Sequence, residues 1–297
     1  MISSLRIVLL AVGLATAACA SSTPPPVAAP ASAPAPAPSA AATATGAPAA
    51  SASAAPAAAP APAPAGDVSV PDPPGERVTL SAGASGWLGA PSTPGKHPAI
   101  LVIQEWLGVT PWIKEDVARF ASQGYVALAV DLYRGKVAHD PGEAHELMRG
   151  LPEDRALDDM KAGFDWLAKR PDVDARRIGI VGWCMGGGYA LAFAVAEPRL
   201  AAVAMNYGKL VTAPEKIKAI HAPLLGNFAG QDRGIAPDDV RAFGDELRAA
   251  GKTADIKVYE GAKHAFMNST NQEAYDPASA KDAWERIDAF FARVLKS

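Results

Sequence analysis

Cysteine is scarce in this 297-residue sequence, which contains only Cys19 and Cys184. A disulfide-rich scaffold is therefore excluded, and if Cys19 is modified then Cys184 has no partner. Runs of basic residues are also lacking and the nominal net charge is −3, which argues against nucleic acid as a partner. No cluster of His, Cys and Asp has the spacing of a metal site, so we expect no metal.

Charged and aromatic residues are absent from residues 20–65, which are almost entirely Ala, Pro, Ser and Thr. Such a segment buries too little apolar surface to offset the entropy cost of ordering its backbone. We therefore predict a disordered Ala/Pro-rich spacer over residues 20–66, extended where prolines alternate with alanines. The remaining residues, 67–297, are enough for a single well-packed domain.

The first 19 residues have the layout of a secretory signal, with Arg6 followed by an apolar run over residues 7–14. This run is too short to span a bilayer comfortably. The small residues 16–18 before Cys19 resemble a bacterial lipobox, in which the cysteine is lipidated, although Thr16 stands where leucine is usual. We expect an exported protein that reaches a membrane only through lipid on Cys19, with conventional cleavage and a soluble product as the alternative.

Strand-like and helix-like segments alternate along the rest of the chain. Continuous apolar runs suit strands that are covered on both faces, whereas apolar stripes at helical spacing suit surface helices. We expect strands at 76–80, 86–89, 99–104, 125–130, 177–181, 201–205, 224–229 and 256–259, and helices after Pro111 and at 153–169, 185–196, 238–250 and 279–294. This order predicts an α/β fold with a mostly parallel central sheet, helices on both faces, and chemistry at the carboxyl ends of the strands.

The most informative segment is residues 178–188, where an apolar strand runs into Gly182-x-Cys184-x-Gly186 and then into an apolar helix. This is the pattern of a nucleophile elbow with cysteine in place of serine. Glycines stand two residues to either side because side chains would collide in so tight a turn. The turn would aim the backbone N–H of Met185 at a developing oxyanion, and the helix N-terminus favours a thiolate.

Two other interpretations of this segment are available. A cysteine after an apolar strand is often just a small buried residue. A Gly-rich turn at the start of a helix can also hold phosphate. The lysine and threonine of a phosphate-binding loop are missing, and the glycine spacing does not match a dinucleotide site, so we favour the elbow.

A nucleophilic thiol needs a base and a carboxylate, which follow the nucleophile in this chain order in such folds. Asp232 and His264 both lie just after predicted strands. His264 would take the thiol proton and later protonate the leaving group, while Asp232 would fix its tautomer. The other histidines, at positions 97, 139, 145 and 221, lie in turns or a polar helix and are read as solvated. Asp238 and Asp239 are read as capping carboxylates.

These motifs together resemble those of the dienelactone hydrolases (carboxymethylenebutenolidases). The likeness rests on Gln104-Glu105, Asp131-Leu132-Tyr133, the cysteine elbow and the Gly-Ala-x-His-Ala-Phe segment ending at Phe266, and it covers nearly all of residues 71–297. It implies an α/β-hydrolase fold, no cofactor, and a triad of Cys184, Asp232 and His264. It also implies that Glu105 assists activation of the thiol, and that the backbone N–H of Trp106 joins that of Met185 as an oxyanion donor.

The sequence departs from the best-known family members in the pocket. These hold a substrate carboxylate with arginines, one of them four residues after the catalytic histidine, where this chain has Asn268. Arg134 and Arg149 are near enough in sequence to the place of the second arginine to substitute for it. We therefore expect a monomeric hydrolase that opens a lactone or cleaves a small ester through a thioester intermediate. A thioesterase on the same triad, or a non-catalytic exported binding protein with this fold, are the alternatives.

Overall fold

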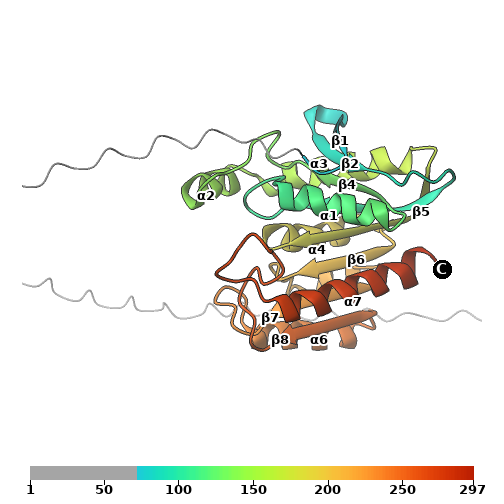
Figure 1. Cartoon of the computed structure of the whole chain (residues 1–297). Coiled ribbons are helices and arrows are strands. Elements are labelled where there is room, and N and C mark those ends of the chain that lie inside the picture. The colour runs from blue at the N-terminus through green and yellow to red at the C-terminus, as the bar shows by residue number, and fades with distance from the viewer. Residues whose placement is uncertain (1–71) are drawn as a thin grey trace, which may run out of the picture. The chain divides into compact units, whose positions relative to one another are not determined.

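The computed structural model describes residues 72–297 (Figure 1). The predicted signal segment over residues 1–19, lipidation at Cys19, and the spacer over 20–66 lie outside the described residues, and these stay predictions. In the part that is described, one eight-stranded sheet runs through the molecule, from β1 and β2 at one end to β8 at the other.

The central sheet is mostly parallel, as the sequence predicts. Its strand order is β1-β2-β4-β3-β5-β6-β7-β8; β1 and β2, and β2 and β4, pair antiparallel, and all other neighbours are parallel. Both β3 and β4 are apolar and buried along almost their whole length, because helices cover both faces. The strands are β1 (Glu76–Thr79), β2 (Ser85–Gly89), β3 (His97–Ile103), β4 (Val126–Val130), β5 (Val173–Trp183), β6 (Ala202–Asn206), β7 (Leu224–Ala229) and β8 (Ala254–Tyr259).

The helices form two layers that enclose two separate apolar clusters. One cluster packs α1 and α7 against one face of the sheet, and the other packs α3, α4, α5 and α6 against the opposite face. Alternate residues of the strands point into the two clusters, as the two-residue period of a strand requires. The helices are α1 (Pro111–Ser122), α2 (Pro141–Arg149), α3 (Glu153–Ala168), α4 (Met185–Ala196), α5 (Pro214–Ala219), α6 (Pro237–Ala249) and α7 (Pro277–Leu295), with a 3-10 turn at Ser81–Gly83.

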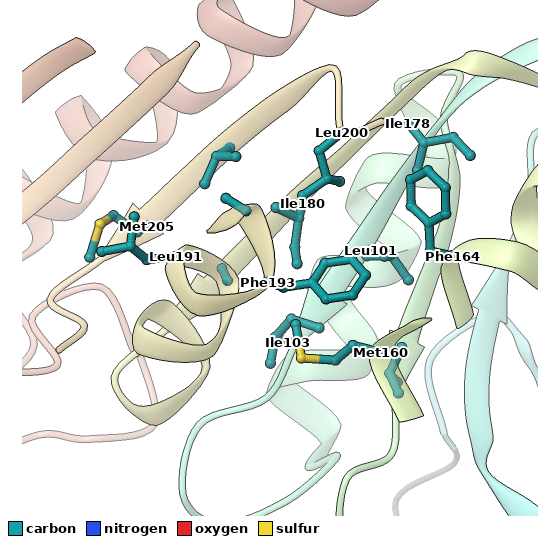
Figure 2. Packing of buried hydrophobic residues seen from close by; sticks show 14 of the residues in the cluster. Leu101, Ile103, Met160, Phe164, Ile178, Ile180, Leu191, Phe193, Leu200 and Met205 are labelled. Atoms are coloured by element: carbon teal, nitrogen blue, oxygen red, sulfur yellow. The ribbon is translucent and has the colours of Figure 1, made fainter. Parts of the chain in front are cut away.

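The packing under α4 holds this helix, and hence the turn that precedes it, against the centre of the sheet. Phe193 of α4 packs at 6.3 Å from Phe164 of α3, measured between ring centroids. Figure 2 shows these rings beside Leu101 of β3 and Ile180 of β5, all four of them buried in one cluster. Burial of these aromatic and branched side chains contributes strongly to the stability of the folded state.

The structure corrects the sequence predictions at several places. Strand β5 begins at Val173, before the predicted start at residue 177, and α2 and α5 were not predicted. His97 begins β3 rather than lying in a turn or helix. The interpretation of Asp238 and Asp239 as caps is wrong, because the N-cap of α6 is Ala236 and it makes no side-chain capping bond. Both carboxylates instead lie in the first turn, where the helix dipole favours negative charge.

Candidate active site

The predicted site residues all follow the carboxyl ends of neighbouring parallel strands. Glu105 follows β3, Cys184 follows β5, Asp232 follows β7 and His264 follows β8. Because these strands are parallel, their ends meet at one edge of the sheet. All four residues line the same cleft, which has a volume of about 1270 Å³. The structure thus brings together side chains that are far apart in sequence.

Cys184 stands on a strained turn between β5 and α4. Its backbone angles are φ 53° and ψ −120°, a region that residues with a side chain rarely adopt. A Cβ on Gly182 would lie 2.1 Å from the carbonyl oxygen of Gly186, and one on Gly186 would lie 2.3 Å from that of Ile103. The glycines are therefore required by the closeness of the backbone, as predicted for the elbow.

Two buried asparagines hold the turn from behind, and the sequence analysis did not single them out. The side chain of Asn206 donates to the carbonyl of Gly182 at 3.1 Å, and that of Asn227 donates to Asn206 Oδ1 at 2.8 Å. The backbone N–H of Cys184 in turn donates to the Asn206 carbonyl at 3.0 Å. A polar residue that ends an apolar strand, as Asn206 ends β6, is the sequence signal that could have pointed to this role.

Asp232 and His264 form a close pair. Nδ1 of His264 lies 2.6 Å from Oδ2 of Asp232, and Oδ1 of Asp232 accepts from the backbone N–H groups of Gly234 and Ile235 at 2.9 and 3.2 Å. Burial acts to raise the pKa of Asp232, but the hydrogen bond with His264 and the two backbone bonds outweigh it and the pKa is lowered. A carboxylate held in this way fixes the ring orientation and leaves Nε2 of His264 as the nitrogen facing away from Asp232.

The electrostatic surroundings of His264 favour its charged form. Burial acts to lower the pKa of His264, but interactions with Asp232 and with Cys184 oppose this and raise the pKa to about 10. The ring also packs edge-on against Tyr207, with ring centroids 5.2 Å apart. An imidazolium next to a thiol stabilises the thiolate, so this arrangement is suited to a cysteine nucleophile.

Glu105 is a buried carboxyl group, only 5% exposed, that lines the cleft. Its Oε2 accepts a hydrogen bond from the side chain of Asn268 at 2.6 Å, whereas its Oε1 is buried without a partner among the described residues. Burial raises the pKa of Glu105 to about 7, although Asn268, His264 and Tyr207 act to lower it. This carboxyl group therefore changes charge near neutral pH.

The segments that carry the predicted oxyanion donors are tied together by Tyr133. Its hydroxyl donates to the carbonyl of Trp106 at 3.0 Å and lies 3.3 Å from the sulfur of Met185. Met185 is the first residue of α4, so its N–H belongs to the helix turn that lacks intrahelical partners. Trp106 and Met185 thus stay predicted donors, placed on segments that meet beside Cys184.

The walls of the cleft include features that the sequence analysis missed. His139 and His145, read as solvated, are exposed but line the cleft, one before and one within α2. The cations of the lining are Arg233 and Lys263, adjacent in sequence to Asp232 and His264. Arg134 and Arg149 do not belong to the lining, and Arg134 instead pairs with buried Asp159 at 3.0 Å.

Residues 72–297 contain no group of three or more His, Cys, Asp and Glu side chains arranged to hold a metal ion. Over the same residues, no helix is both long and apolar enough to cross a membrane.

A mostly parallel sheet, with a strained turn between a central strand and a helix and with a carboxylate and a histidine after later strands, defines the α/β-hydrolase fold. The family model of the dienelactone hydrolase family matches residues 84–295. The chain belongs to the dienelactone hydrolase family, and it is accordingly a hydrolase that acts on ester bonds of small-molecule ester or lactone substrates.

Individual relatives agree with this assignment. The chain is 37% identical over 213 residues to the "Putative carboxymethylenebutenolidase" of Salmonella typhi, covering 67% of this chain and 78% of that protein. It is 34% identical over 218 residues to Protein usf of Aquifex pyrophilus, covering 71% and 93% of the two chains. Among solved structures, a "Putative Dienelactone Hydrolase" from Klebsiella pneumoniae has 33% identity and a TM-score of 0.66, covering 71% of this chain and 93% of that one.

Proposed function

We propose that the chain hydrolyses a lactone or small ester through a Cys184–His264–Asp232 triad and a thioester intermediate. The observation that carries this proposal is the placement of Cys184 on the strained turn, in the same cleft as a histidine whose Nδ1 lies 2.6 Å from a buried carboxylate. The raised pKa of His264 supports a thiolate–imidazolium pair in the resting site.

In the first half of the reaction, the sulfur of Cys184 attacks the substrate carbonyl carbon and forms a C–S bond. The negative charge that develops on the carbonyl oxygen is held by the backbone N–H groups of Trp106 and Met185. The tetrahedral centre then collapses, the C–O bond to the leaving group breaks, and His264 gives its proton to the departing oxygen. In a lactone the leaving oxygen stays attached to the acyl chain.

In the second half, neutral His264 takes a proton from water while the water oxygen attacks the thioester carbon. The C–S bond breaks, the carboxylic acid leaves, and the proton on His264 restores the thiolate–imidazolium pair. Asp232 keeps its negative charge throughout and stabilises the imidazolium. Glu105 adds a second carboxyl group that interacts electrostatically with His264, so the charge state of Glu105 alters the stability of the thiolate–imidazolium pair.

The test is hydrolysis of a panel of aryl esters and small lactones by the full chain, with Cys184→Ala and Cys19→Ala measured in parallel. We expect turnover to vanish in Cys184→Ala and to persist in Cys19→Ala, since these are the only two cysteines. Mass spectrometry of the quenched reaction should find the acyl group on Cys184. A Cys184→Ala variant that keeps its activity excludes the thiol mechanism. A folded wild-type chain that turns over nothing, with an unreactive thiol, favours a binding protein.

A thioesterase reaction on the same triad is the alternative activity, since the acyl-enzyme would be the same. Adding acyl thioesters of matched acyl groups to the panel separates the two. A kcat/KM for thioesters well above that for the oxygen esters of the same acids would favour the thioesterase.

We also propose that the protein is exported and carries lipid on Cys19, as the N-terminal sequence predicts. Metabolic labelling with a fatty acid analogue in a bacterial host, comparing wild type with Cys19→Ala, tests this directly. Label that is lost in the variant supports lipidation. Unprocessed protein in the cytosol would contradict both export and lipidation, and processed but unlabelled protein would favour a conventionally cleaved signal.

A further inference from the structure

Asn268 lies in a loop but is fixed by backbone hydrogen bonds and by burial. Its backbone N–H donates to the carbonyl of Ala265 at 3.0 Å, and its own carbonyl accepts from the N–H of Asn271 at 3.1 Å. Its side chain is also buried, with 5% of the residue exposed. The position of Asn268 relative to His264 is thus fixed by the backbone of the same loop.

The side-chain amide of Asn268 has a defined orientation. Its Oδ1 accepts two hydrogen bonds from Thr270, one from the backbone N–H at 2.9 Å and one from the hydroxyl at 2.6 Å. A flipped amide would place its NH₂ group against these donors, so the oxygen must face Thr270. The NH₂ group is therefore the end that meets Oε2 of Glu105, at 2.6 Å.

This arrangement makes the two oxygens of Glu105 unequal. Oε2 already accepts a hydrogen bond, and adding a proton there would weaken that bond. Oε1 is buried and has no partner among the described residues. A proton that binds Glu105 therefore goes to Oε1, on the side of the carboxyl group that Asn268 does not occupy.

We propose that Asn268 is a positioning residue that, oriented by Thr270, binds Oε2 of Glu105 and reserves Oε1 for the proton that Glu105 gains and loses beside Cys184 and His264. The inference rests on the proposed function only for its consequence in catalysis, because the ionisation of Glu105 can be followed without any substrate. An O–H bond forms or breaks at Oε1 as the proton exchanges with water, and no other bond changes.

The titratable groups that face Glu105 come from three other parts of the fold. His264 lies after β8, Tyr207 lies after β6, and Asp116 lies on α1. Burial, and then the charge of Glu105, raise the pKa of Asp116 well above its usual range. A neutral amide partner lets Glu105 adopt either charge state, whereas a cation at position 268 would hold it ionised.

The first test follows the carboxyl band of Glu105 by difference infrared spectroscopy as a function of pH, with Glu105→Gln to assign the band. In Asn268→Ala the ionised form loses a hydrogen-bond donor, so the midpoint should move upward by about one pH unit, a tenfold change in proton affinity. Thr270→Val should move it in the same direction by less. Ser269→Ala, an exposed neighbour outside the cleft lining, is the matched control and should leave it unchanged.

The second readout is the pH dependence of the alkylation rate of Cys184, whose inflection should move with the infrared midpoint. An unchanged midpoint in folded Asn268→Ala overturns the proposal, as does an equal shift in Ser269→Ala. If Asn268→Ala does not fold, an unchanged midpoint in Thr270→Val overturns it. A shifted midpoint in a protein that hydrolyses nothing on the panel would support the positioning role and reject the proposed function, so the two failures are distinguishable.

Discussion

Replacing Gly182 with alanine tests whether the turn at Cys184 depends on close backbone contact. The added Cβ would lie 2.1 Å from the carbonyl oxygen of Gly186 and 2.4 Å from its carbonyl carbon, so the backbone must move. Overpacking of this kind costs about 1–3 kcal/mol. We expect the upper end, because Gly186 is itself pressed against the end of β3 and the turn cannot retreat in that direction.

For a domain of this size, a loss of about 3 kcal/mol lowers the melting temperature by about 6–12 °C. A displacement of Cys184 by about 1 Å would also reduce hydrolysis about a hundredfold. Thermal unfolding followed by circular dichroism and the hydrolysis rate measure the two effects. Gly261→Ala is the matched control, since its Cβ would meet no atom within 4 Å. Gly261→Ala should leave the free energy of unfolding unchanged or raise it by about 0.4–1 kcal/mol.

The reasoning would be refuted by a Gly182→Ala protein that melts with the wild type and keeps its activity. A Gly261→Ala protein that is destabilised as much as Gly182→Ala would also refute it, because the effect would then belong to any glycine in these loops.

Three further perturbations address the rest of the site and its support. Asp232→Asn should lower the pKa of His264 and slow alkylation of Cys184 at neutral pH. The pKa of His264 is raised from 6.5 to about 10, so the stability that its charged form contributes is present below pH 6.5 and is lost as the pH rises through 10. The difference in melting temperature between wild type and Asp232→Asn should therefore narrow between these two pH values. Asn206→Leu leaves the buried side-chain NH₂ group of Asn227 without its acceptor. It should lower the free energy of unfolding, measured with urea, by about 1–3 kcal/mol. Phe193→Ala should cost about 3–5 kcal/mol by the same measurement, because the ring is fully packed under α4.

Most of the fold could be predicted from the sequence because its strands are strongly apolar and its helices have clear stripes. The bounds of α4 and β7 agree with the prediction, since a glycine-rich turn precedes α4 and a run of buried residues defines β7. Helix α2 was missed because Ala144 is its only buried residue, which leaves no apolar stripe to detect. Helix α5 was missed because it is a single short element of six residues.

The candidate site could be predicted only as far as its chemistry is carried by local motifs. Cys184, Asp232 and His264 each follow a strand, so topology alone places them at one edge. The contact between Asn268 and Glu105 joins residues 163 positions apart, and no local pattern signals it. The cations Arg233 and Lys263 were missed for a different reason. The motifs identify their neighbours Asp232 and His264, whereas an exposed charged residue in a loop is too common to indicate a site.

Backbone strain is concentrated where the site is built, and the sheet is what maintains it. Cys184, Tyr207 and Ala265 all have positive φ without being glycine, and such residues cost about 1–3 kcal/mol each. Each strained segment is held by a hydrogen bond, from the N–H of Cys184 to Asn206, from that of Tyr207 to Asn227, and from that of Asn268 to Ala265. Asn206 ends β6 and Asn227 lies within β7, and neither strand can shift without breaking the hydrogen bonds to its neighbours. The rigid order of β5, β6 and β7 therefore holds the nucleophile and the ring that packs on His264 in positions that an isolated loop would not keep.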